Sequence, residues 1–130
     1  MNKDILIVDD EEDIRQLIAG ILQDEGYYTR LAWDYNSIKQ EISKRIPALV
    51  LLDVWLENSK LDGIEILKLI KKSYPNLPII MISGHGTIQM AINSLKVGAF
   101  NFIEKPFDTS LLLLNINRAI DNADLRKKIS

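Results

Sequence analysis

The segment at residues 9–12 reads Asp-Asp-Glu-Glu and directly follows a short apolar run at residues 5–8. A further carboxylate, Asp53, comes directly after a second apolar run at residues 48–52. Carboxylates that lie together repel one another unless they share a cation. Oxygen ligands without His or Cys suit Mg²⁺, which keeps several waters and takes one or two carboxylates. These acids therefore indicate a candidate magnesium site.

Plainer interpretations of the same residues stay open at this point. Acids at residues 9–12 could simply favour the dipole of a following helix, which accounts well for Glu11 and Glu12. Asp53 could start a turn through its side chain. Ser83 and Lys105, the other polar groups that follow apolar runs, are isolated in the sequence, and a lone lysine is usually a surface residue.

Two periodicities alternate along the chain and predict the elements that position these groups. Short apolar runs typical of buried strands alternate with apolar residues at helical spacing. Five strands and five helices in strict alternation predict an α/β fold, with a parallel sheet and helices on both faces. Ligands of such sheets bind at the carboxyl ends of the strands, where all the polar groups named above fall. The expected strands lie at residues 5–8, 29–32, 48–52, 78–82 and 100–103.

Local signals predict where the helices begin and end. Gly26 and Gly98 are expected to end the first and fourth helices, because glycine readily adopts the left-handed conformation that closes a helix. Pro47 and Pro75 end the second and third. Expected N-caps are Asn36 or Ser37 for the second helix, Thr87 for the fourth, and Asp108 or Thr109 for the fifth.

Composition fits one globular domain of 130 residues and 14.8 kDa, with 47% hydrophobic and 26% charged residues. The 16 basic and 18 acidic residues give a net charge of −2, which argues against a general nucleic-acid-binding surface. The chain has no cysteine, so disulfides and thiolate metal sites are excluded. No signal peptide or membrane span is expected, and a cytoplasmic domain is the simplest expectation.

A set of short motifs, each at the end of its expected strand or helix, resembles the receiver domain of bacterial two-component response regulators. The resemblance covers about residues 3–122 and implies a doubly wound sheet of flavodoxin-like order 2-1-3-4-5, with strands one and three adjacent. The motifs are Val-Asp-Asp-Glu at 8–11, Leu-Leu-Asp at 51–53, Asp-Gly at 62–63, Ile-Ser-Gly at 82–84 and Glu-Lys-Pro-Phe at 104–107.

The resemblance implies a role for each acid. Asp53 would be the phosphoacceptor that attacks a phosphohistidine on a sensor histidine kinase. Asp10 would bind Mg²⁺ directly, together with Asp53, and Asp9 would bind it through water. Trp55 would offer its backbone carbonyl to the metal. Carboxylates are established nucleophiles in phosphoryl transfer, so the residue types fit this chemistry.

The resemblance also implies roles at the fourth and fifth strands. Ser83 would hydrogen-bond the phosphoryl group, and Lys105 would neutralise its charge. Phe102 would be an aromatic switch residue coupled to Ser83, although a strand residue of this kind could equally belong to the core. The Lys105–Pro106 peptide bond would be cis.

The segment at residues 53–63 is two residues longer than the common receiver loop and lacks its proline, so its course is not predicted. Together with neighbouring stretches it is similar to the nitrogen-regulation, NtrC/NtrX-like subfamily. That subfamily implies a receiver at residues 1–122 and a helical extension at 123–130, leading to sigma54-type transcriptional output domains absent from this sequence. DNA would be contacted only through such a domain. A homodimer through the fourth helix, fifth strand and fifth helix, or through the C-terminal helix, is expected.

Two other functions share parts of this pattern. A flavodoxin-like flavin module has the same topology, but acids at residues 9–12 would repel the flavin phosphate. An Asp-nucleophile phosphohydrolase would use related chemistry, but the chain is short for a substrate-capping domain. The expected protein is therefore not an enzyme beyond assisting its own phosphorylation and dephosphorylation. His85, between two glycines, is expected to be a solvated loop residue, and Trp33 and Tyr35 to be surface residues.

Overall fold

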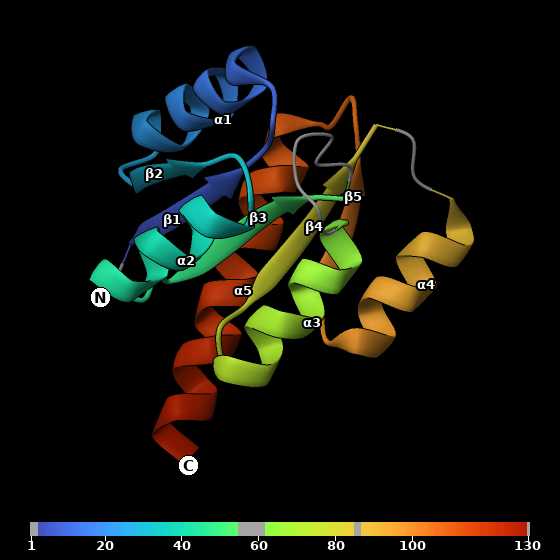
Figure 1. Ribbon diagram of the computed structural model, residues 1–130. Coiled ribbons are helices and arrows are strands. Elements are labelled where there is room, and N and C mark those ends of the chain that lie inside the picture. The colour runs from blue at the N-terminus through green and yellow to red at the C-terminus, as the bar shows by residue number, and fades with distance from the viewer. Residues whose placement is uncertain (1–2, 55–61, 85–86, 130) are drawn as a thin grey trace.

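A computed structural model describes residues 3–54, 62–84 and 87–129. Strands and helices alternate strictly along these residues, as the sequence predicts (Figure 1). The elements are β1 (Asp4–Val8), α1 (Glu12–Asp24), β2 (Tyr28–Ala32), α2 (Tyr35–Lys44), β3 (Leu49–Asp53), α3 (Gly63–Ser73), β4 (Ile79–Ser83), α4 (Ile88–Val97), β5 (Asn101–Glu104) and α5 (Thr109–Ile129).

The five strands form one parallel sheet in the order β2-β1-β3-β4-β5. This is the doubly wound α/β order that the resemblance implies, and it places β1 directly beside β3. The register pairs Val8 with Leu52, so the residues that follow β1 lie next to the last residue of β3. The carboxyl ends of the central strands therefore meet at one edge of the sheet.

The sheet separates two hydrophobic cores, because successive side chains of a strand point to opposite faces. Leu6 and Val8 of β1 face the core beneath α2, α3 and α4. Ile5 and Ile7 face the core beneath α1 and α5. Every residue of β1, β3 and β4 is buried, which explains why these strands read as continuous apolar runs. Figure 1 shows the helices covering both faces of the sheet.

Most of the expected helix boundaries are confirmed. The Thr87 hydroxyl accepts a hydrogen bond from the Met90 amide at 3.1 Å and caps α4, and Gly98 ends that helix with φ +118°. The Asp108 carboxylate accepts from the Leu111 amide at 3.1 Å, at the start of α5.

The expected cap of α2 is wrong. The helix begins at Tyr35, and Asp34 is its N-cap instead of Asn36 or Ser37. The Asp34 carboxylate accepts a hydrogen bond from the Ser37 amide at 2.8 Å, while the Asp34 amide donates to the Ser37 hydroxyl at 3.1 Å. This reciprocal capping box satisfies two backbone donors at once and lets the helix begin two residues before Ser37.

One buried acid joins the amino end of β1 to β2 and α2. Asp4 is 1% exposed, and its carboxylate accepts hydrogen bonds from Arg30 at 2.7 Å and 3.1 Å. Arg45, directly after α2, donates to the same carboxylate at 3.0 Å. A buried carboxylate needs such partners because its desolvation is costly.

No described helix combines the length and the apolar character needed to cross a membrane.

A close backbone approach fixes the start of α3 against the end of β3. The amide of Gly63 donates to the Val54 carbonyl at 2.9 Å. A Cβ atom added at Gly63 would lie 2.6 Å from the Val54 Cα atom and 2.7 Å from the Asp53 carbonyl oxygen. Only glycine permits this contact without moving backbone. The Asp62 side chain caps the same helix by accepting from the Glu65 amide at 2.8 Å.

This contact predicts opposite effects of the same substitution at two glycines. Gly63→Ala is expected to lower the free energy of unfolding by about 1–3 kcal/mol, because the backbone must shift to admit the methyl group. Gly20→Ala in α1, where an added Cβ meets nothing within 4 Å, is expected to raise it by about 0.5–1 kcal/mol. Urea unfolding of both variants tests this. Equal stability of the two variants would contradict the argument.

Candidate functional site

Three carboxylates meet at the carboxyl edge of the sheet. Asp9 and Asp10 directly follow β1, and Asp53 is the last residue of β3. Carboxylate oxygens of the three side chains all lie within 4.8 Å of one another. Asp9 is 2% exposed and Asp53 6%, whereas Asp10 is partly exposed. Like charges this close are unfavourable without a compensating cation.

Backbone groups hold Asp9 in place. Its amide donates to the Ala32 carbonyl of β2 at 3.2 Å, and its carboxylate Oδ1 accepts from the Glu11 amide at 2.9 Å. Arg15, one turn into α1, donates to the Asp9 carbonyl at 2.7 Å. The Arg15 guanidinium also lies 5.7 Å from the centre of the Trp33 ring, a cation–π distance. Asp9 is therefore held between β2 and the start of α1.

Lys105 supplies the positive charge that two of these acids need. Its ammonium Nζ lies 2.8 Å from Asp9 Oδ2 and 3.3 Å from Asp53 Oδ2. Its amide donates to the Ser83 carbonyl at 2.8 Å, which extends the β4–β5 pairing by one residue. The Lys105–Pro106 peptide bond is cis, the geometry that the resemblance implies. The side chain of Lys105 is only 19% exposed, so its ion pairs are largely shielded from water.

The environment of Lys105 shifts its pKa. Burial alone would lower the pKa of this ammonium, but the hydrogen bond to Asp9 and the charge of Asp53 outweigh burial. The pKa of Lys105 is therefore raised above its ordinary value. A raised pKa in the folded state means that this ion pair stabilises the fold at neutral pH. Its contribution is lost only as the pH rises through that raised pKa.

The two other predicted residues, Ser83 and Phe102, lie in β4 and β5. Ser83, the last residue of β4, is fully buried and stands in register with Glu104 of β5. Phe102 is partly buried and packs against the core beneath α2, α3 and α4. It pairs in register with Met81, two residues before Ser83.

Five polar residues that the sequence predicts at one edge of the sheet do lie together there. The structure places Asp9, Asp10, Asp53, Ser83 and Lys105 there, from four different strand ends. Trp55, His85 and the course of the 55–61 segment lie outside the described residues.

Arg15 is not among the residues expected at the site. Its only signal in the sequence is its position four residues after Glu11, because one helical turn brings its side chain back toward the end of β1.

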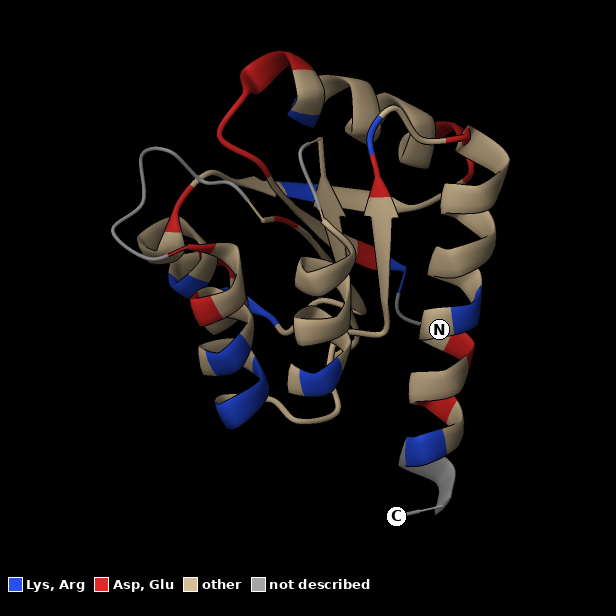
Figure 2. Ribbon diagram, turned by 90° about the vertical axis from the view of Figure 1, so that its right-hand side faces the viewer, with Lys and Arg blue, Asp and Glu red and all other residues tan. Residues whose placement is uncertain are grey.

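The three carboxylates form an all-oxygen donor set, which fits a hard divalent cation such as Mg²⁺. Figure 2 shows the acidic segments at the upper edge of this view, where α1 begins and where β5 ends.

The chain belongs to the response regulator receiver domain family, whose model matches residues 5–117. It is 50% identical over 129 residues to the nitrogen assimilation regulatory protein NtrX of Azorhizobium caulinodans, a match that covers 99% of this chain and 28% of that protein. The receiver domain of NtrX from Brucella abortus superposes with a TM-score of 0.87 at 53% identity, over 91% of this chain and 98% of that one. The predicted NtrC/NtrX-like subfamily is therefore confirmed.

A further solved relative is a dimer in an activated state. The solution structure of the beryllofluoride-activated NtrC4 receiver domain dimer matches with a TM-score of 0.86 and 35% identity, over 93% of this chain and 98% of that one. The family membership favours phosphorylation-dependent signalling over the flavin module and the phosphohydrolase considered from the sequence.

The geometry around Lys105 predicts how its pKa responds to each acid. Asp9→Asn is expected to lower the pKa of Lys105 clearly, because the shorter of its two carboxylate contacts loses its charge. Asp53→Asn should lower it less, since that contact is 0.5 Å longer (3.3 Å against 2.8 Å). Titration of the lysine Cε signal by NMR measures both values, with Glu12→Gln as the control. An unchanged pKa in Asp9→Asn would contradict the assignment.

Proposed function

We propose that this domain accepts a phosphoryl group on Asp53 from a sensor histidine kinase and thereby switches a transcriptional output. The observation that supports Asp53 is its position: it ends a buried strand among two other acids, with the Lys105 ammonium 3.3 Å from its carboxylate. Family membership supports the signalling role.

The proposed step is an in-line transfer between two nucleophiles. A carboxylate oxygen of Asp53 forms a bond to phosphorus, and the phosphorus–nitrogen bond of the kinase phosphohistidine breaks. The electron pair of the broken bond stays on the imidazole nitrogen. Lys105 neutralises charge on the phosphoryl oxygens, and the Ser83 hydroxyl hydrogen-bonds one of them. The domain assists its own phosphorylation and dephosphorylation and turns over no separate substrate.

A bound Mg²⁺ would supply further neutralisation of the phosphoryl oxygens. Asp10 and Asp53 would hold it directly, Asp9 through water, and Trp55 through its carbonyl. The structural support is the three-carboxylate cluster, in which the Lys105 ammonium contacts Asp9 and Asp53. Asp10 is also the most exposed of the three, which suits a ligand of an ion that keeps several waters.

Phosphorylation at Asp53 predicts a single mass adduct. Acetyl phosphate with Mg²⁺ is expected to add about 80 Da, the mass of one HPO₃ group, to the intact protein. Asp53→Asn should abolish the adduct, and Asp10→Asn or a chelator should slow its formation strongly. Asp24→Asn, at the exposed end of α1, is the matched control and should behave as wild type. A full adduct on Asp53→Asn would refute the phosphoacceptor assignment.

The element best placed to respond is α4. Its one buried residue among the described positions is Ser94, whose hydroxyl has no hydrogen-bond partner within the described structure. Ile88 is 81% exposed and Leu95 47%, so this helix buries little apolar surface. Segments with few buried contacts open and shift at low cost. Phe102 is partly buried and packs against the core beneath α2, α3 and α4. Its ring would change position when Ser83 moves toward the phosphoryl group.

Coupling between Ser83 and this region has a direct test. Ser83→Ala should leave Asp53 phosphorylatable but weaken the NMR shift changes that phosphorylation causes in α4 and β5. The reason is that a ligand shifts a two-state equilibrium only through contacts that differ between the states. Ser43→Ala, an exposed serine of α2, is the control. Equal α4 and β5 responses in Ser83→Ala and wild type would refute the coupling.

The output is proposed from the subfamily. The chain spans 28% of its Azorhizobium relative, so residues 1–122 would be the receiver and residues 123–130 the start of a helical connection to sigma54-type, DNA-binding output domains. Homodimerisation would link phosphorylation to that output. The dimer would form through α4, β5 and α5, or through the C-terminal part of α5 alone. Exposed leucines on α5 support the first surface: Leu111 is 50% and Leu114 47% exposed.

A further inference from the structure

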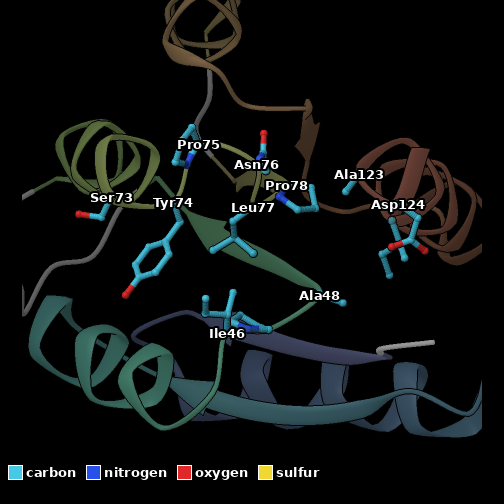
Figure 3. A pocket seen from close by; sticks show the side chains of 12 residues that line it. Ile46, Ala48, Ser73, Tyr74, Pro75, Asn76, Leu77, Pro78, Ala123 and Asp124 are labelled. Carbon is cyan, nitrogen blue, oxygen red and sulfur yellow. The ribbon is translucent and has the colours of Figure 1, made fainter. Parts of the chain in front are cut away.

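The amino end of the sheet carries two cavities, one on each side of the turn that joins α3 to β4. The first has a volume of about 330 Å³ and is largely lined by apolar side chains. Figure 3 shows Tyr74 and Leu77 pointing into it, toward Ile46. In the same view the Asn76 amide points the other way, out of this cavity. Asn76 also lines the second cavity, so its amide is directed to that side of the turn.

The second cavity, here called the basic groove, has a volume of about 390 Å³, within the range of small-ligand sites. It lies between the end of α3, the end of α4 and the last turns of α5. Two cations line it, Lys71 from α3 and Arg126 from α5, and none of its described lining residues is acidic. The residues that argue for a ligand are Lys71, Asn76, Gly98, Asn122 and Arg126.

Lys71 is held in position with one donor to spare. Its Nζ donates to the Pro75 carbonyl at 2.8 Å and to the Leu77 carbonyl at 3.1 Å. An ammonium has three donors, so one remains after these two bonds. Gly98 allows the lysine stem to pass closely, because an added Cβ there would lie 3.1 Å from the Lys71 Cε atom. The ammonium is therefore fixed by backbone, not by a carboxylate.

Arg126 reaches the groove from one face of α5. Ala119, Asn122, Ala123 and Arg126 follow the i, i+3, i+4, i+7 spacing of a single helix face, and all four line the groove. Within the described residues neither Arg126 nor Lys71 forms an ion pair with a carboxylate. Asp124, two residues earlier on α5, lines the other cavity.

The two cations act on each other across the groove. Burial lowers the pKa of Lys71, and the charge of Arg126 lowers it further. Two cations that form no ion pair with a described carboxylate repel each other, and an anion between them would relieve that repulsion. The acidic edge at the opposite end of the sheet shows the reverse case, in which the Lys105 ammonium contacts two carboxylates.

We propose that the basic groove binds a small oxyanion, a phosphate or carboxylate group of a compact ligand. The free donor of Lys71 and the guanidinium of Arg126 would contact its oxygens, and the amides of Asn76 and Asn122 would add hydrogen bonds. Hydrogen bonds between charged groups are about twice as strong as neutral ones, which makes these two cations the main determinants of affinity. The groove is separate from the carboxyl edge of the sheet, where Asp53 lies.

The proposal predicts saturable binding that can be mapped by NMR. Inorganic phosphate and succinate, each titrated at constant ionic strength without Mg²⁺, are the probes for the two sources of oxyanion. At least one should shift the amides of Gly98 and Ala99 and the side-chain amides of Asn76 and Asn122. The anion that binds more tightly identifies the ligand class. The titration should also raise the pKa of Lys71, because a nearby anion favours the charged form.

Variants separate this site from general attraction to basic surface. Arg126→Gln should weaken binding about tenfold, and it removes a side chain that makes no ion pair in the described structure. Lys71→Gln should do the same, and thermal unfolding shows whether its contacts to the turn are needed for folding. Lys72→Gln removes an equal charge from the exposed neighbouring position and should bind as wild type. The proposal is overturned if neither anion shows saturable shifts, if Arg126→Gln and Lys72→Gln bind equally, or if the shifts gather around Ser83 and Gly84.

Discussion

The arrangement of this domain depends on one electrostatic constraint: two buried carboxylates at the ends of neighbouring strands require a cation. Asp9 and Asp53 are almost fully buried, and the Lys105 ammonium lies within 3.3 Å of both. Desolvation disfavours all three charges singly, and only their mutual contact makes the cluster tolerable. Three carboxylates meet at this edge and Lys105 brings a single positive charge to them, so the cluster keeps an excess of negative charge. That excess is what a divalent cation would neutralise before a phosphoryl group could approach.

The backbone around this cluster is built to leave little freedom. The strand order sets β1 beside β3, and the register then decides which acids meet. Gly63 allows α3 to begin in direct contact with the backbone of Asp53 and Val54, and its amide donates to the Val54 carbonyl. On the other side, the Lys105 amide is bound to the Ser83 carbonyl. By contrast α4 is attached through little buried surface. The domain thus joins a rigid charged edge to one loosely packed helix, the combination a switch requires.

Local patterns in the sequence predicted the elements and the α/β class, whereas the strand order that sets β1 beside β3 came from the resemblance to receiver domains. Alternating apolar runs and helical periods specify the elements, and polar residues that end parallel strands must share an edge. The α2 cap was missed because Ser37 acts as the third residue of a capping box, and a single cap residue does not reveal that pairing. Arg30 and Arg45 around Asp4, like Lys71 and Arg126 in the basic groove, are distant in sequence. Their meeting depends on tertiary packing, which no periodicity encodes.

The two ends of α3 relate the acidic edge to the basic groove. Gly63 touches the backbone of the proposed phosphoacceptor, and Lys71 lies eight residues further along the same helix, roughly 12 Å away at about 1.5 Å per residue. Salt screens charges over about 8 Å at physiological ionic strength, so an anion in the groove would act only weakly on Asp53 through its field. Mechanical connection through a helix is not screened. A shift of α3 that followed the Lys71 ammonium would reach Gly63, whose amide is hydrogen-bonded to the Val54 carbonyl at 2.9 Å. The close approach that fixes the site is therefore also the route by which the far end of the domain could act on it.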